Sequence, residues 1–511
     1  MSYSKDKLTH IIPVHLTYIS QRSTIGTKLE REIIMSVNNN KETDITGDNQ
    51  IPEDVLAKAQ LPKNKKRQPA KKLGELFKII REHDLQEAEN IEITVLETMK
   101  TEFEKVRDPR NPSYVTYKLA DILIIVLLAV LANNNTWYDI EIFAYSHRKF
   151  LSKLLCMEND TMPTDDTYRL IISHIDMNII HGALVRLLIN RIDYAIERHA
   201  AVHEKSEPDI IPFDGKASRS SGRGETFDQQ KAQPLFTLNA YSTNYEMCID
   251  QSFINHKTNE IPEMPLLIKH MNISGAIVTC DALNTQPDTA AAIIGGGGMY
   301  VMPVKGNRKN LYAHLNNRFS ETLRNDLENN DGRKPQYKIT VDKEHGGTAI
   351  REYYITPFIW SLYHVEEWAG ITAIGMVRRI FRSNKPGVPT TCADRYYILG
   401  GISDIDTFAR SARKHWEIEN KCHWNLDYTM KDDANKTMEG SGAEGLQLIK
   451  KAALSVLTVA RVLFKPYVSL NYIRSSICQG FEDVILRVLS ILDVDSLIEA
   501  NRSEFDMDAS N

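Results

Sequence analysis

The chain has 511 residues, of which 42% are hydrophobic, and its formal net charge is −5. This length is too great for one compact core and predicts about three domains, while the hydrophobic content excludes a wholly disordered protein. The acidic balance excludes attraction of a polyanion by overall charge, so any contact with nucleic acid requires a local basic surface. Six scattered cysteines without a CxxC pair argue against a zinc ribbon and against a disulfide framework.

The first hundred residues differ in composition from the rest. Residues 38–49 are polar, and a basic cluster between Lys63 and Lys72 lies beside two prolines. We expect residues 1–60 to form a weakly ordered extension and residues 61–105 to form a basic linker that leads into a helix. The basic cluster is either a contact for DNA phosphates or a solvated linker.

Residues 119–132, LADILIIVLLAVLA, are strongly apolar. They include Asp121 and are shorter than the roughly 20 residues that span a bilayer, so they predict a buried helix. We expect this helix to belong to a helical domain at residues 106–200. The N-terminal residues lack the pattern of a secretion signal, which predicts a cytoplasmic protein with no membrane contact.

Two later segments have the composition of buried strands that end in an aspartate. One runs from Ile210 to Asp214, and the other from Gly275 to Asp281. We expect each strand to present its carboxylate at its C-terminal end, where the active sites of open α/β sheets gather. A single aspartate after a strand is more often a cap or a turn residue, so the pair needs a third carboxylate to indicate a site.

The segments that follow are predicted to be mainly strands. The glycines at 295–298 lack the Lys-Ser/Thr of a phosphate-binding loop and predict a turn into a strand. Alternating apolar and polar residues predict three further strands, at Tyr337–Val341, Arg351–Ile355 and Ile371–Val377.

Residues 410–433 predict a helix that carries His415, Glu419 and His423 at four-residue spacing. This face either borders a cleft and holds a metal ion, or it is the solvated side of an amphipathic helix. Two apolar-periodic helices follow, at 446–463 and 481–497, and they pack against the sheet or form a dimer surface.

Three carboxylates brought together in the fold would suit divalent metal ions. Mg²⁺ prefers hard oxygen ligands, and a pair of such ions can promote in-line displacement at phosphorus. The imidazoles of His415 and His423 would instead favour a transition metal.

Several motifs, in order, resemble the DDE transposases of bacterial insertion sequences, in particular the branch that includes the H-repeat-associated proteins. The resemblance covers roughly residues 107–462. The motifs that carry it are Asp214-Gly215-Lys216 with Arg219, Val278-Thr279-Cys280-Asp281-Ala282, Lys305-Gly306-Asn307, and His415-Trp416-Glu417-Ile418-Glu419-Asn420 with His423-Trp424.

The resemblance implies that Asp214, Asp281 and Glu419 are the catalytic residues and the metal ligands, with Mg²⁺ as cofactor and Mn²⁺ able to substitute. Glu417 lies two positions from Glu419, roughly 200° around a helix, so both cannot face one site. The side chains that we expect to contact DNA, with ordinary surface charge as the alternative, are Lys216, Arg219, Lys305, Arg351, His415 and His423.

The fold class that the resemblance implies is α/β, with an RNase H-like catalytic core of a mixed sheet flanked by helices. Asp281 and Glu419 lie far apart in the chain, which predicts a β-rich insertion between them. The expected organisation is a helical N-terminal domain (106–200), a first part of the core (205–314), the insertion (315–400), a core helix region with the glutamate (401–465) and C-terminal helices (466–511).

The function implied is that of an insertion-sequence transposase, which cleaves element ends and transfers the strands to target DNA. Its partners would be the terminal repeats and target DNA, and it would act as a homo-oligomer on DNA. Two alternatives stay open: a stand-alone metal-dependent nuclease or metallohydrolase that uses His415, Glu419 and His423, and a catalytically inactive DNA-binding protein derived from a transposase.

Overall fold

The computed structural model describes residues 70–82, 95–200, 207–222, 234–254, 260–328, 336–344, 346–357, 364–434, 441–464, 468–490, 493 and 498. All of these lie in one compact unit, Leu61–Asn511. The predicted N-terminal extension and residues 61–69 and 83–94 of the predicted basic linker lie outside the described residues.

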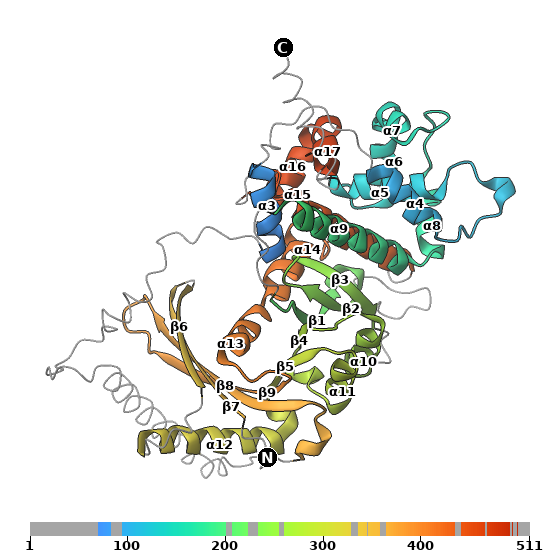
Figure 1. The fold of residues 1–511 in the computed structure, drawn as a ribbon. Coiled ribbons are helices and arrows are strands. Elements are labelled where there is room, and N and C mark those ends of the chain that lie inside the picture. Colours follow the sequence, from blue (N-terminus) through green and yellow to red (C-terminus); the bar gives the residue numbers. More distant parts are fainter. Residues whose placement is uncertain are drawn as a thin grey trace, which may run out of the picture. The chain divides into compact units, whose positions relative to one another are not determined.

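One mixed sheet organises the part of the unit that carries the two aspartates (Figure 1). The described strands lie in the order β3-β2-β1-β4-β5-β9-β8-β7-β6. β4 runs parallel to β1 and β5 runs parallel to β4, whereas all other neighbours are antiparallel. The strands are β1 (Ile210–Ser218), β2 (Leu235–Ser242), β3 (Met247–Phe253), β4 (Ile277–Thr279), β5 (Met299–Val304), β6 (Gln336–Glu344), β7 (Gly347–Thr356), β8 (Ile371–Ser383) and β9 (Thr391–Gly400).

The three strands predicted from alternation are confirmed, since they lie within β6, β7 and β8. The predicted end of the first aspartate strand was wrong. β1 continues past Asp214 to Ser218, because this whole stretch pairs with β2, from Asp214 opposite Asn239 to Ser218 opposite Leu235. Asp214 therefore lies in the middle of a strand, where β2 pairs with it on one side, while on the other side β4 pairs only as far as Pro212.

Helices cover both faces of the sheet. One face packs against α10 (Glu260–His270), α11 (Pro287–Gly295) and α12 (Lys309–Glu328), and the other packs against α13 (Ile405–Lys414). Along β1, Phe213 points into the first core and Ile210 into the second. Because side chains alternate along a strand, Asp214 shares the face of Ile210, which is the α13 side.

The remaining helices form a second region around α15 (Ser441–Ala460), which contacts α5, α8, α9 and β3. The segment after residue 440 thus packs mainly on helices that come more than 200 residues earlier in the chain. The other helices are α3 (Lys71–Glu82), α4 (Val95–Glu104), α5 (Leu119–Leu131), α6 (Trp137–Ser146), α7 (Arg148–Leu155), α8 (Asp165–His174), α9 (Met177–His199), α16 (Leu470–Gln479) and α17 (Phe481–Ser490).

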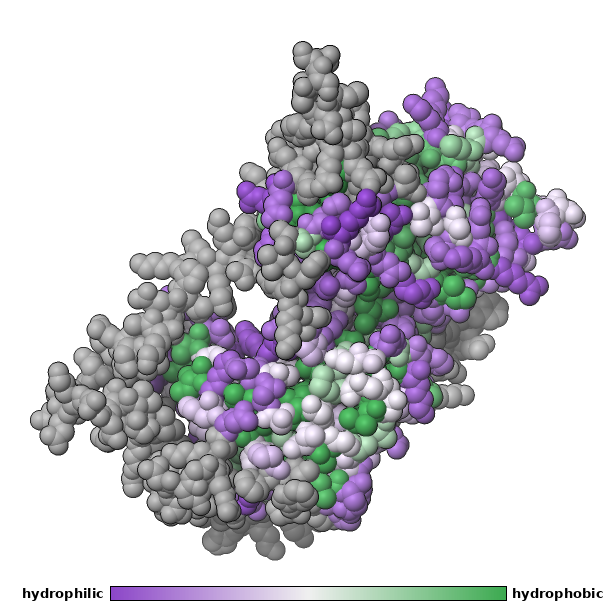
Figure 2. Space-filling model, viewed as in Figure 1, coloured by the Kyte–Doolittle hydropathy of each residue, from purple (hydrophilic) through white to green (hydrophobic). Residues whose placement is uncertain are grey.

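The apolar stretch predicted as a buried helix is α5, and all of its residues are buried, Asp121 included. Figure 2 shows that the surface around these helices is largely hydrophilic in this view, with apolar residues in small separate spots. Among the described helices, none is by itself long and apolar enough to cross a membrane; α8 and α9 pass such a test only as a pair, which is bent by 87°.

The predicted turn at the glycines is also confirmed, because α11 ends at Gly295 and β5 begins at Met299. All six cysteines are free thiols.

Candidate active site

The helix predicted to carry Glu419 is present, but its central turn is wider than an α-helix. α13 is followed by a π-helical turn at Ile418–His423 and then by α14 (Trp424–Tyr428). The buried side chains of Ile418, Cys422 and Leu426 hold this turn against the core, while Glu419 stays exposed. Such π-helical turns are rare in proteins, and those that occur are often found at functional sites.

The two histidines beside Glu419 each reach a different predicted aspartate. His423 Nδ1 lies 3.4 Å from Asp214 Oδ2, and His415 Nε2 lies 3.8 Å from Asp281 Oδ1. Thr279 Oγ1, at the end of β4, is 3.1 Å from His415 Nδ1 and orients that ring. The helix therefore spans both aspartates and places the glutamate between the two contacts.

The three predicted carboxylates are close enough to influence one another electrically. Burial raises the pKa of Asp214 to about 7, and the charges of Asp281, Glu260 and Glu419 add to the effect, while the Gly215 backbone N–H opposes it. The pKa of Asp281 is lowered instead, chiefly by the neighbouring His415 ring, against an opposing effect of burial. The charges of Asp281 and Glu419 thus both act on Asp214, and the assignment of the three carboxylates to one site stays a prediction.

Glu260, at the start of α10, is a fourth carboxylate near this place. Asn284 Nδ2 donates a hydrogen bond of 2.7 Å to its Oε2, and burial raises its pKa. Gly215 makes room for it, since a Cβ at this position would collide with the Glu260 carboxylate and with the Phe236 ring. No role was predicted for Glu260 from the sequence.

The donor set suits a hard divalent cation, because four carboxylates repel one another and a cation would offset that repulsion. The carboxylates fit such a cation by their charge and by their oxygen ligands. Among the described residues, no three Asp, Glu, His or Cys side chains are already drawn together as a metal-binding group.

A chain of buried polar groups fixes the His423 ring from behind. Lys451 Nζ donates to Asn239 Oδ1 over 2.6 Å, so the other end of that amide, Nδ2, donates to His423 Nε2 over 3.2 Å. Nε2 then carries no proton, and the proton sits on Nδ1, which faces Asp214. Burial, with Lys216 and Lys451 nearby, lowers the pKa of His423 to about 3, which keeps the ring neutral.

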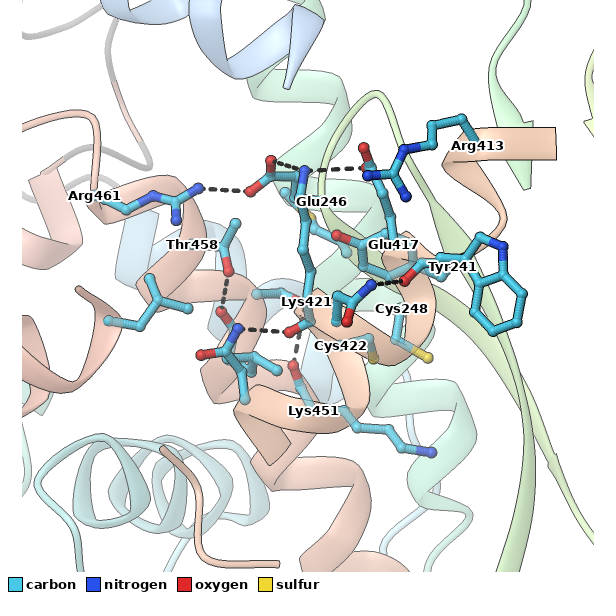
Figure 3. Close-up of a pocket in the computed structure, with 17 residues that line it drawn as sticks. Tyr241, Glu246, Cys248, Arg413, Glu417, Lys421, Cys422, Lys451, Thr458 and Arg461 are labelled. Atoms are coloured by element: carbon cyan, nitrogen blue, oxygen red, sulfur yellow. Dashed lines mark hydrogen bonds and ion pairs between the residues drawn. The ribbon is translucent and has the colours of Figure 1, made fainter. Parts of the chain in front are cut away.

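Glu417 points away from the carboxylates, as the helical geometry predicted. It lines a cavity of about 320 Å³ behind the π-helical turn, where Lys421 Nζ lies between Glu417 at 3.0 Å and Glu246 at 2.7 Å (Figure 3). Arg461 holds the other oxygen of Glu246 at 2.6 Å. These ion pairs attach the helix to the turn before β3 and to the residue that follows α15, and Glu419 is not among the residues that line this cavity.

The side chains expected to contact DNA fall into two groups. Lys216 is buried and lies 2.5 Å from Asp427, and Arg351 is buried against Asp342 and Glu344. Arg219 and Lys305 are exposed, and the Lys305 charge helps to lower the pKa of Asp281. Contact with DNA stays a prediction for all of these residues.

Two family models match the chain. Residues 205–450 match one described as a transposase DDE domain, and residues 100–188 match one described as DDE_Tnp_1-associated. The "H repeat-associated putative transposase YhhI" of Escherichia coli K12 is 30% identical over 362 residues, which are 70% of this chain and 89% of that protein.

Two further relatives agree in extent. The "Putative transposase YncI" of Escherichia coli O157:H7 is 28% identical over 69% of this chain and 85% of its own length, and an "Uncharacterized protein in dhlA 3'region" of Xanthobacter autotrophicus is 28% identical over 61% and 97%. A cryo-EM structure of a piggyBac transposase synaptic complex with hairpin DNA covers 83% of this chain and 80% of its own, at 11% identity and a TM-score of 0.31, which does not establish a shared fold.

Proposed function

Because this chain belongs to the DDE-type transposases of insertion sequences, we propose that it cleaves DNA at the ends of such an element and joins the freed ends to target DNA, with Asp214, Asp281 and Glu419 as its catalytic carboxylates. The observation that supports this most is that His423 lies 3.4 Å from Asp214 and His415 lies 3.8 Å from Asp281, so the segment that carries Glu419 contacts both aspartates. These residues are far apart in the chain, so they can act together only through the fold.

The three carboxylates would hold Mg²⁺, or Mn²⁺ in its place. When bound, the metal ions supply the charge that offsets the phosphate and lower the pKa of the attacking water or hydroxyl. Asp214 and Asp281 would bind from the fixed sheet, and Glu419 would bind from the exposed side of the turn. Neutral His423 and its neighbour His415 would orient the aspartates.

We also propose that strands β1 to β5 form an RNase H-like core. The order β3-β2-β1-β4-β5, with β4 and β5 running in the direction of β1, supports this assignment. The four strands β6 to β9 would then be the predicted insertion, although they continue the same sheet through β5 and β9. The domain limits given above stay our proposal, with α12 as a helical start to the 315–400 segment.

A labelled duplex that carries an element end, located beside the gene, tests the function. The protein is incubated with it and with target DNA in Mg²⁺, in Mn²⁺ or with a chelator. We expect metal-dependent nicking and joining, lost in Asp281→Asn and Glu419→Gln. Glu417→Gln is the matched control, because Glu417 lies on the same helix but faces the cavity behind it.

Two results would contradict the proposal. If the wild-type protein binds verified ends and cuts them in neither metal, it is a DNA-binding protein without catalysis. If cleavage requires Zn²⁺ and is lost in His415→Ala and His423→Ala but not in Asp281→Asn, the metallohydrolase alternative replaces it. The separate contacts of the two histidines with two aspartates favour the carboxylate site.

A further inference from the structure

Three neighbouring strands end their apolar rows in an arginine on the α13 side of the sheet. On this face, each buried apolar residue has an arginine two positions away on the same strand. The pairs are Tyr353 and Arg351 on β7, Val377 and Arg379 on β8, and Tyr397 and Arg395 on β9. Arg351 and Arg379 are direct cross-strand partners, and Val377 is the partner of Arg395. The sheet thus places the Arg351 and Arg379 backbones side by side, and Arg395 lies diagonally from Arg379, two residues along β9 from Ala393.

These arginines line a hollow of about 220 Å³ together with the end of the helix that carries the catalytic glutamate. Arg413, Trp416 and Asn420 form its other wall. Asn420 is exposed and directly follows Glu419, so one wall of the hollow belongs to the same helical turn as the proposed catalytic glutamate. We call the hollow the arginine groove.

The charge of the arginine groove is positive even after its internal ion pairs are counted. Glu344 contacts both Arg351 and Arg379, and Asp342 lies 2.7 Å from Arg351 and 3.8 Å from Arg413. Two carboxylates therefore face four guanidinium groups. The fourth, Arg395, is exposed and stacks over the Trp416 ring at 4.9 Å.

Placing like charges directly opposite on adjacent strands destabilises a sheet. Arg351 and Arg379 form such a pair, and because Glu344 contacts both but offsets only part of their charge, a bound anion would offset the rest. Guanidinium groups bind phosphate with two parallel hydrogen bonds, and a row of them on adjacent strands suits a ligand with repeated phosphates.

We propose that the arginine groove holds the phosphodiester backbone of the DNA strand that is cut at Asp214, Asp281 and Glu419. This rests on the proposed function, because it takes DNA as the substrate. The aromatic rings that line the groove are engaged, with Tyr353 and Tyr397 buried in the core and Trp416 stacked under Arg395. The contact is therefore with phosphates and is independent of base sequence.

Affinity for DNA as a function of salt tests this proposal. The probes are a labelled duplex that spans the end of the element and a scrambled duplex of equal length, both without metal. For Arg395→Gln and for Arg413→Gln we expect affinity to fall by about three- to tenfold for both duplexes. The slope of log affinity against log salt should fall in magnitude by about one for each arginine.

Arg487→Gln is the matched control, since Arg487 is also an exposed arginine stacked on an aromatic ring, Phe464 at 5.4 Å, but lies on α17 in the helical region. Unfolding temperatures check that all variants are folded. The proposal is overturned if Arg395→Gln binds both duplexes like Arg487→Gln, or if its loss is confined to one sequence.

The outcome separates this proposal from the proposed function. If the wild-type protein cuts element ends, and Arg395→Gln binds DNA like the Arg487→Gln control, the proposed function is supported and the proposed role of the arginine groove is wrong. If the wild-type protein never cuts DNA, but Arg395→Gln binds DNA more weakly and with a smaller salt slope than the wild type, DNA binding in the arginine groove is supported and the catalytic proposal fails.

Discussion

Asn239 donates a hydrogen bond to Nε2 of His423 over 3.2 Å, and this contact decides which nitrogen of the imidazole carries its proton. The amide is held in that orientation from its other end by Lys451, across 2.6 Å. Both Asn239 and Lys451 are almost fully buried. A lysine on a helix of the second region therefore determines what His423 presents to Asp214.

Replacing Lys451 by methionine should lower the rate of DNA cleavage by about 10–100-fold, the usual effect of losing a group that orients a metal-ligand neighbour. Without the ammonium group the Asn239 amide can turn over, which moves the His423 proton to Nε2 and leaves a lone pair toward Asp214. Mn²⁺ affinity, measured by calorimetry, should weaken in parallel. A Lys451→Met variant with an unchanged cleavage rate and an unchanged Mn²⁺ affinity would contradict this role.

Lys450→Met is the control for that experiment. Lys450 is the adjacent residue and is just as buried, but its ammonium group faces Asp432 at 3.8 Å and the Lys431 carbonyl at 3.4 Å. We expect it to lose stability without the specific loss of Mn²⁺ affinity.

Asp214→Asn should stabilise the metal-free protein at neutral and higher pH. Burial and the nearby carboxylates raise the pKa of Asp214 from 3.8 to about 7 in the folded chain. An acid with a raised pKa binds more protons in the folded state, so stability falls as the pH rises from about 4 to about 7. Removing the charge should recover on the order of 1–2 kcal/mol at pH 8.

Chemical denaturation in the presence of a chelator, at acid and at alkaline pH, measures this effect. The advantage of Asp214→Asn should vanish below the ordinary pKa of an aspartate and should shrink when Mn²⁺ is added, since the cation stabilises only the wild-type protein. An advantage that is equal at both pH values would rule out charge as its source.

His415→Ala should shift the acid limb of the pH–rate profile toward higher pH. The neighbouring His415 ring is the largest cause that lowers the pKa of Asp281, so without it protons compete more strongly for that carboxylate. Thr279→Val should give a smaller shift in the same direction, because it removes only the 3.1 Å contact that orients the ring. Cleavage rates across the acid range, at saturating Mg²⁺, distinguish these shifts from a uniform loss of rate.

Gly215→Ala should destabilise the protein by about 1–3 kcal/mol, the usual cost of inserting a methyl group where packing is tight. The new Cβ would meet the Phe236 ring and the Glu260 carboxylate, and cleavage should fall because Glu260 is displaced toward Asp214. Gly306→Ala is the comparison, since no atom lies within 4 Å of its added Cβ. Equal unfolding free energies for the two variants would show that Glu260 moves freely.

Local patterns in the chain were sufficient to predict several elements. Continuous apolar residues predicted α5, and alternation predicted strands within β6, β7 and β8. The resemblance predicted Asp214, Asp281 and Glu419 as one catalytic site, which stays a prediction, and the helical angle predicted that Glu417 and Glu419 face different ways. These features depend on residues a few positions apart or on motifs in a fixed order.

The rest of the site depends on contacts that no local pattern contains. Lys451 and Asn239 are 212 residues apart, and Lys216 and Asp427 are 211 residues apart. The burial that makes Lys216 an internal ion-pair partner comes from β2 and α14, so its sequence neighbours gave only its charge. The wider turn at 418–423 likewise follows from packing of Ile418 and Cys422, not from helix propensity.

The continuous sheet has a consequence for any attempt to shorten this enzyme. α13 rests its Phe408 ring edge-on against Tyr353 of β7 and Tyr397 of β9, so the platform under the glutamate-bearing helix is made largely of the added strands. Deleting residues 336–383 would remove β6, β7 and β8, and with them much of the surface on which that helix packs. The added strands and the catalytic turn must therefore be inherited, swapped or engineered as one piece.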